Sequence, residues 1–255
     1  MYFWGLFIKP FVYNELRIYK ERVQITMKKF NLVASLVALL ALTACEGKGV
    51  EYAEFHEKAN EQQTAINADL ADGKLPFKSV TIKGSSKEHA EMMGMSEDTD
   101  VKVEKTLTFE GESASDWASI SKWNGYAELS DDEKVIFSSY TFAHMADLPD
   151  YNEYFKNYES YDGVKTSGKG FNYYVSNGFK VTADLKIKGD YSDSEGTGSI
   201  DIVVKGSYVA GKDGFLTKVN VKSNMSITAT GTLAGIEMTT TMVENSEEAL
   251  TISRK

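Results

Sequence analysis

The sequence predicts an α+β fold in which helices cover an antiparallel β-sheet. An amphipathic helical pattern comes first, over residues 50–71. From residue 170 onward, short segments alternate apolar and polar residues and are separated by turn signals, which is typical of an antiparallel meander. The polar residues leave one face of this sheet in water. The apolar face needs a cover, and the helix has the apolar stripe to supply it.

The N-terminal helix is predicted by apolar residues that share one helical face. They are Tyr52, Phe55, Ala59, Ile66 and Leu70, separated by three, four, seven and four positions. Gly73 ends the pattern and Pro76 follows it, as is usual at a helix C-terminus.

The alternation of apolar and polar residues that is typical of a strand begins at residues 77–84 and returns at 101–109. In the second segment the apolar residues all lie at odd-numbered positions and so fall on one face. The polar stretch 85–100 between them has no period and predicts a loop. Further on, Ser130 followed by three acidic residues and the pair Pro149-Asp150 predict the starts of short helices. Residues 133–142, EKVIFSSYTF, fit a strand equally well.

The C-terminal part predicts a series of short strands. They cover residues 179–190, 199–209, 215–223, 224–231, 236–244 and 247–253. Breaks are predicted at GDYSDSEGTG (189–198), AGKDG (210–214), GTLAG (231–235) and ENSE (244–247). No internal repeat and no Pro- or Ser-rich linker interrupts this region, so residues 50–255 are expected to form one domain.

The segment before this domain has the pattern of a secretory signal. Two lysines follow Met27, an apolar run covers residues 32–42, and small residues lead to Cys45, the only cysteine. The apolar run is short for a span, which takes about 20 residues. An uncleaved anchor helix with an incidental cysteine is the alternative.

The signal pattern divides the chain into an extension before the expected true start at Met27 (1–26), a signal peptide (27–44), a tether (45–49) and the domain. A genuine N-terminal extension is the alternative for residues 1–26.

The end of the signal, Leu42-Thr43-Ala44-Cys45, resembles the bacterial lipobox. The resemblance implies that the Cys45 sulfur receives a diacylglyceryl group and that cleavage before Cys45 leaves it as a lipidated N-terminus. Two acyl chains retain a protein at a membrane, because one chain alone binds only marginally. The implied location is the extracytoplasmic face of the cell membrane. Without another cysteine, the domain is expected to fold without disulfides.

Charge excludes one class of partner. Residues 1–44 hold six of the 28 basic and two of the 37 acidic residues, so residues 45–255 keep 22 basic and 35 acidic residues, a net charge of −13. Nucleic-acid affinity comes largely from basic contacts to phosphate. We therefore expect no nucleic-acid partner and no electrostatic adhesion to an anionic bilayer.

The order of one helix, then amphipathic strands with short helices between them, resembles the LolA/LppX/LprG-type superfamily of lipoproteins and lipid carriers. Residues 206–228, GSYVAGKDGFLTKVNVKSNMSIT, carry the nearest local likeness. The resemblance implies a strongly curved antiparallel sheet, a half-barrel covered by helices. Such a sheet would enclose a cavity for a lipid or other apolar ligand, which the protein binds and in some relatives transfers. The alternative is a filled core in an envelope structural or protein-interaction module with no small ligand.

Two clusters are candidates for ligand contacts. Tyr151, Tyr154, Phe155 and Tyr158 fit a cavity rim, and core packing is their alternative role. His89, Met92, Met93 and Met95 have donors that suit Cu(I), and a loop that packs its methionines is the alternative. We favour neither a metal nor a cofactor. No G-x-S-x-G elbow occurs, so an enzyme is the least supported class.

Overall fold

The computed structural model describes residues 49–92, 95–192, 196–233 and 236–255, and the side chains of 231–238 are not described. The signal, Leu42, Thr43, Ala44, Cys45 and Met93 lie outside the described residues. Gly49, placed in the tether from sequence, already belongs to the first short strand.

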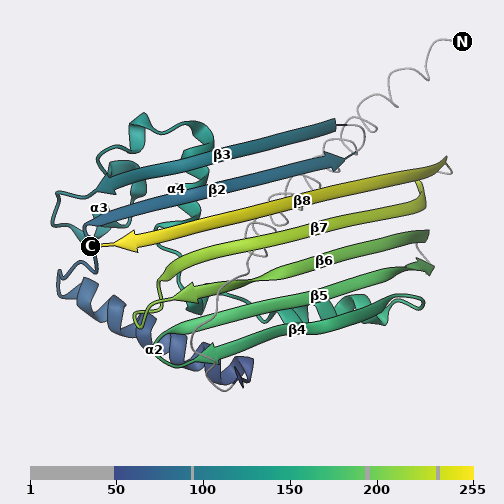
Figure 1. Cartoon of the computed structure of the whole chain (residues 1–255), viewed down its shortest axis with the longest axis horizontal. Helices are drawn as coiled ribbons and strands as arrows, with labels where there is room; N and C mark the ends of the chain where they lie inside the picture. The colour runs from purple at the N-terminus through teal and green to yellow at the C-terminus, as the bar shows by residue number, and fades with distance from the viewer. Residues whose placement is uncertain (1–48, 93–94, 193–195, 234–235) are drawn as a thin grey trace, which may run out of the picture. The chain divides into compact units, whose positions relative to one another are not determined.

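In these described residues, eight strands form one antiparallel sheet with the order β1-β4-β5-β6-β7-β8-β2-β3 (Figure 1). The strands are β1 (Gly49–Val50), β2 (Ser79–Met92), β3 (Met95–Thr108), β4 (Lys165–Val175), β5 (Phe179–Ser192), β6 (Gly196–Ala210), β7 (Leu216–Leu233) and β8 (Ile236–Arg254). Strands β5 to β8 form the predicted meander, and β4, which was not predicted as a strand, pairs with β5. The β2–β3 hairpin pairs with β8. Within the described residues, the two edges of the sheet do not pair, so the sheet is open.

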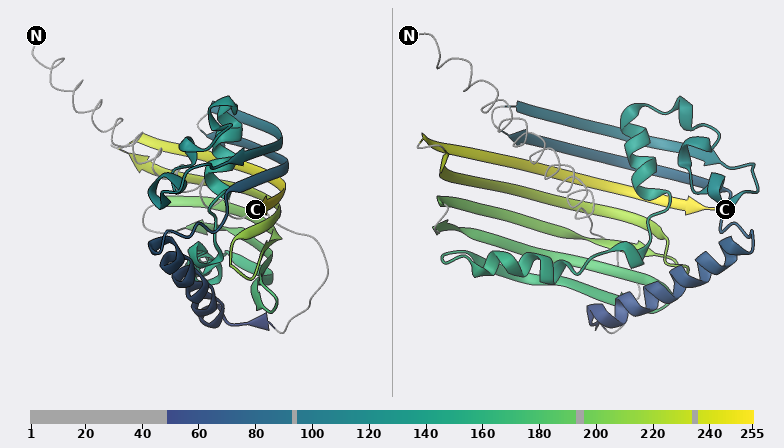
Figure 2. Two further views of the ribbon diagram at one scale, coloured as in Figure 1. Left: turned by 90° about the vertical axis from the view of Figure 1, so that its left-hand side faces the viewer. Right: turned by 180° about the vertical axis from the view of Figure 1, so that it is seen from behind.

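Alternation along the strands separates two faces. In β5, Phe179, Val181, Ala183, Leu185 and Ile187 are all buried, and the intervening residues are half-buried or exposed. Successive strand side chains point to opposite faces. We call the face with the buried core the inner face and the opposite one the outer face. Figure 2 shows the described helices on one side of the sheet.

The helices that follow Ser130 and Asp150 begin where the sequence predicts, and the short helix at Ala114–Trp117 was not predicted. The described helices are α2 (Tyr52–Ala71), α3 (Ala114–Trp117), α4 (Asp131–Tyr140) and α5 (Tyr151–Lys156), with 3₁₀ turns at Ile120–Lys122, Tyr126–Glu128, Met145–Asp147 and Asn157–Ser160. A capping box between Ser130 and Glu133 opens α4, and Asp150 accepts the first amides of α5. The strand alternative for residues 133–142 is therefore wrong.

The α2 helix packs through its first turns. Phe55 and Ala59 are its buried residues. The Phe55 ring lies 5.2 Å from that of Tyr173 and 5.7 Å from that of Phe179. Tyr52 donates a 2.7 Å hydrogen bond to the Leu148 carbonyl. Because Ile66 and Leu70 are half-buried, the later turns contribute less to the core.

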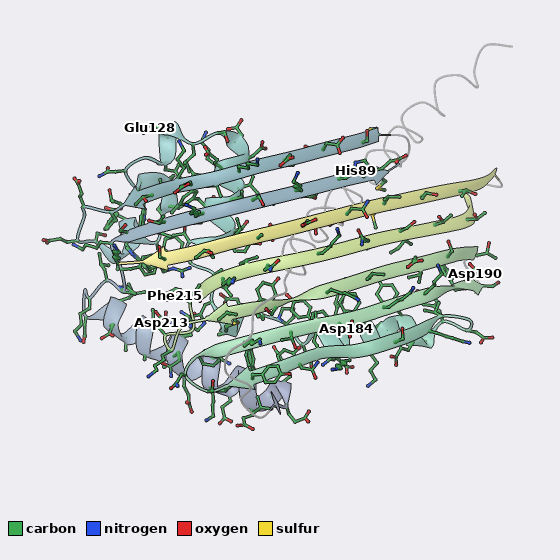
Figure 3. All side chains as sticks on the ribbon, viewed as in Figure 1. His89, Glu128, Asp184, Asp190, Asp213 and Phe215 are labelled. Carbon is green, nitrogen blue, oxygen red and sulfur yellow. The ribbon has the colours of Figure 1, made fainter. Side chains whose placement is uncertain are left out.

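Arg254 joins β8, β7 and α4 at the C-terminal end of the sheet. It donates to the carbonyls of Thr141 (3.0 Å), Tyr140 (2.8 Å) and Leu216. Its guanidinium lies 5.1 Å from the Phe215 ring, a cation–π contact. Phe215 lies at this end of the sheet, and His89 lies toward the other (Figure 3).

Two predicted breaks are wrong. Residues 85–100, expected as a loop, belong mostly to β2 and β3, which pair from Ser79↔Thr108 to Met92↔Met95. The expected break at residues 244–247 lies inside β8, whose pairs with β7 continue through it. Likewise, the segments 215–223 and 224–231 form one strand. Polar residues occupy the inner face in these stretches, so the apolar alternation that signals a strand is lost.

Candidate functional site

The candidate site is a group of polar side chains on the inner face of the sheet. In β8, Leu250 and Ile252 are buried in the core. Because side chains alternate along a strand, Glu248, Ser246 and Glu244 share their face. Glutamates 244 and 248 are 4% and 5% exposed, which is unusual for a carboxylate.

Strand register brings further polar residues beside these three. Glu248 pairs with Ser86 of β2, and Ser246 pairs with Glu88 of β2 and Ser223 of β7. Directly opposed residues share a face of the sheet. We call this set the polar patch; its members are Ser86, Glu88, Ser223, Glu244, Ser246 and Glu248.

The two buried glutamates differ in their partners. The Tyr140 hydroxyl, from α4, donates a 2.5 Å hydrogen bond to Glu248 Oε2, and Ser86 Oγ donates to Oε1 at 3.2 Å. Ser223 and Ser246 bond to each other at 2.9 Å. Within the described structure, Glu244 Oε1 is buried without a hydrogen-bond partner. A buried unpaired acceptor costs about 1–3 kcal/mol, so Glu244 is the unsatisfied member of the patch.

Burial dominates the electrostatics of the patch. Burial, with the nearby Glu88 carboxyl, raises the pKa of Glu244 to about 8. Burial also raises the pKa of Glu248 to about 7, although the Tyr140 and Ser86 hydrogen bonds oppose that rise. The pKa of Glu88 is raised by burial and by Glu97. Glu244 and Glu248 are therefore prone to hold protons near neutral pH.

An apolar strip adjoins the polar patch on the same face. Met242 pairs with Met92 of β2 and Ile227 of β7, and Ile227 pairs with Ile200 of β6. Glu244 pairs with Met225, which pairs in turn with Ile202. The apolar strip comprises Met92, Ile200, Ile202, Met225, Ile227 and Met242. Three methionines in it offer a surface that adapts to irregular apolar shapes.

The predicted aromatic rim is divided between core and surface. Tyr151 and Phe155 are buried, and their rings stack on Phe171 at 4.7 and 5.8 Å. Tyr154 is exposed and Tyr158 is half-buried; burial raises the pKa of Tyr158 to about 12. A shallow pocket of about 790 Å³ lies along α2, from Tyr52 to Thr64. None of these four aromatic residues is among the described residues that line it.

The structure separates the candidate metal ligands. His89 and Met92 lie three residues apart in β2 and so point to opposite faces of the sheet. His89 Nδ1 lies 2.7 Å from Asp98 Oδ1 on the outer face, whereas Met92 pairs with Met95 on the inner face. The described residues hold no group of three or more His, Cys, Asp or Glu side chains arranged for a metal ion. His89 is therefore not brought together with Met92 and Met95.

Sequence reasoning missed the polar patch, although a signal was present. In ENSEEALTI (244–252), every second residue from Glu244 leads to Leu250 and Ile252. Every second residue of a strand points to the same face, so counting back from Leu250 and Ile252 would have placed Glu248, Ser246 and Glu244 on the core-facing side.

No family model matches the chain, and no curated protein or solved structure matches it. Among the helices that the structure describes, none has the length and apolar character needed to cross a membrane.

The raised carboxyl pKa values predict that stability falls as pH rises. Unfolded glutamates ionise at about pH 4.3, whereas Glu248 and Glu244 ionise at about 7 and 8 in the fold. Between about pH 4.3 and pH 8, the folded state therefore binds more protons than the unfolded state. The stabilisation that these bound protons give is complete below about pH 4 and is lost as the pH rises through 7 and 8. In the double variant Glu244→Gln/Glu248→Gln, we expect the loss between pH 5 and 8.5 to be about 6 kcal/mol smaller than in the wild type.

Urea unfolding at several pH values measures this difference. Glu247→Gln is the matched control, because Glu247 lies on the outer face of the same strand and pairs with Lys222 at 3.3 Å. Parallel pH profiles for the wild type and the double variant would contradict the assignment.

Proposed function

We propose that the chain is a bacterial lipoprotein anchored through Cys45 on the extracytoplasmic face of the cell membrane, and that its domain binds an amphipathic lipid or similar apolar ligand without catalysis. The observation that carries the binding function is the juxtaposition of the apolar strip and the polar patch on one face of one sheet. An acyl chain matches the strip, and a polar headgroup matches the patch. Transfer of the ligand to another carrier or membrane is a further part of the proposal.

The proposed binding surface is the inner face of a sheet that curves as a half-barrel. The helices on one side of the sheet support this arrangement (Figure 2). The length of the strands supports it too, since β7 and β8 run for 18 and 19 residues. Burying a chain against the strip gains about 25 cal/mol for each Å² of apolar surface removed from water.

The anchor and the charge of the domain suit this role. Two acyl chains on Cys45 would hold the protein at the bilayer. The net charge of −13 on residues 45–255 would keep the domain from adhering to anionic headgroups. The domain would then sit near its ligand without adhering to the bilayer surface.

The anchor is tested by the Cys45→Ser variant of the full chain, expressed in a bacterial host with a labelled fatty acid. The wild type is expected to incorporate the label and to sediment with membranes. The variant is expected to lose the label, because serine offers no thiolate for alkylation. Equal labelling of both proteins would contradict attachment at Cys45.

Ligand binding is tested by two variants of adjacent residues in β8. Met242→Asp places a charge in the apolar strip, and Thr241→Asp places the same charge on the outer face. The full chain is purified in mild detergent, and native mass spectrometry counts the lipid that remains bound. We expect Met242→Asp to reduce bound lipid at least tenfold, since a charge in an apolar contact is costly, and Thr241→Asp to retain it. A wild type that carries no lipid and acquires none from vesicles would contradict the function.

A further inference from the structure

Charges are balanced on the outer face of the sheet. Cross-strand pairs there join Lys83 to Glu104, Lys87 to Asp100, Lys188 to Asp201 and Lys222 to Glu247, at 2.6–3.3 Å. His89 contacts Asp98 in the same way. These five acidic residues of the outer face thus each meet a lysine or histidine on a neighbouring strand.

The inner face lacks this balance. Glu88, Glu97, Glu244 and Glu248 share it, in adjacent positions of β2, β3 and β8. In the described stretches 85–92, 95–102, 220–229 and 239–249, every lysine and histidine belongs to the outer face by strand parity; these are Lys87, His89, Lys102 and Lys222. Glu97 is exposed, Glu88 is half-buried, and Glu244 and Glu248 are buried. Buried carboxyls without a counter-charge in these stretches are complementary to a cation from outside.

We propose that the ligand is a cationic amphiphile, an aliphatic chain ending in an ammonium group, whose ammonium binds between Glu88 and Glu244 while its chain lies on the apolar strip. This inference rests on the proposed function and specifies the ligand class. Glu244 Oε1, buried and without a partner in the described structure, is the acceptor left open for it. Met225, opposite Glu244, and Met242, two residues before it in β8, begin the strip where the chain would continue.

An ammonium fits these residues better than the alternatives do. It has three donors and is satisfied by two carboxylates and a neighbouring acceptor. A hard divalent ion such as Ca²⁺ takes six to eight oxygen ligands, and its ligands here would be adjacent to thioethers. A phosphate-bearing headgroup would be repelled by the same carboxylates. The net charge of −13 on residues 45–255 also attracts a cationic ligand.

Binding of this ligand should depend on pH. The titratable groups that face Glu244 and Glu88 are Glu97 of β3, Glu248 of β8 and, through Glu248, Tyr140 of α4. Because its surroundings raise the pKa of Glu244 to about 8, Glu244 holds a proton below that pH that an ammonium must displace. Affinity should therefore fall by up to about tenfold for each pH unit below the pKa of the displaced carboxyl.

The test compares three probes with the same chain: octylammonium, octanol and octanoate. Each is titrated into the full chain in mild detergent at pH 8.5 and 6.5, and native mass spectrometry counts the bound probe. At pH 8.5, octylammonium is expected to bind at least tenfold more tightly than the other two, and this preference should shrink about tenfold or more at pH 6.5.

Variants of single glutamates test which carboxyls give the preference for octylammonium. Glu244→Gln and Glu88→Gln should each remove the preference, whereas Glu247→Gln should keep it. Circular dichroism establishes that each variant is folded.

The outcomes separate this inference from the proposed function. Equal binding of octylammonium and octanol would overturn the cationic ligand and leave lipid binding in place. Displacement of octylammonium by micromolar Ca²⁺ would assign the carboxyls to a metal ion and would also overturn it. Failure of all three probes, with no copurified lipid, would overturn both.

Discussion

Strict alternation of side chains along β8 is the constraint on which the candidate site depends. Leu250 and Ile252 enter the core, so a strand without a bulge must send Glu248, Ser246 and Glu244 to the same face. A shift of one residue would expose the two apolar side chains and bury their neighbours. The strand therefore cannot keep its core contacts and also release its glutamates to water.

The fold accommodates these carboxyls in different ways. Tyr140 and Ser86 donate to Glu248, which ties it to α4 and β2. In the described part of the chain, Glu244 Oε1 lies without such a donor. Burial raises the pKa of Glu244 to about 8, because a buried neutral acid is less costly than a buried anion. Arg254, at the end of the same strand, satisfies backbone carbonyls and lies far along β8 from Glu244. The inner face therefore combines a fixed polar anchor with an unsatisfied group beside apolar residues, and a ligand can meet both.

Sequence patterns predicted those parts of the fold in which apolar periodicity or capping chemistry is strong. The antiparallel meander, the alternation of β5 and the helix starts at Ser130 and Asp150 are in this class. The far half of β2 and the continuity of β8 through residues 244–247 were missed because Glu88, Glu244 and Glu248 occupy inner positions and remove the apolar alternation. The candidate Met/His cluster is separated for a geometric reason. A spacing of three residues keeps side chains close on a helix, but it puts His89 and Met92 on opposite faces of a strand. The residues that broke the pattern are the ones that form the candidate site.

The most direct test of this account is a carboxyl titration followed by NMR in protein carrying ¹³C-labelled glutamate side chains. The account predicts two glutamates that titrate near pH 7 and 8, with one signal absent from Glu248→Gln and the other from Glu244→Gln. If every glutamate titrated near its ordinary pKa of about 4.3, these carboxyls would be in water, and the buried polar patch would be contradicted.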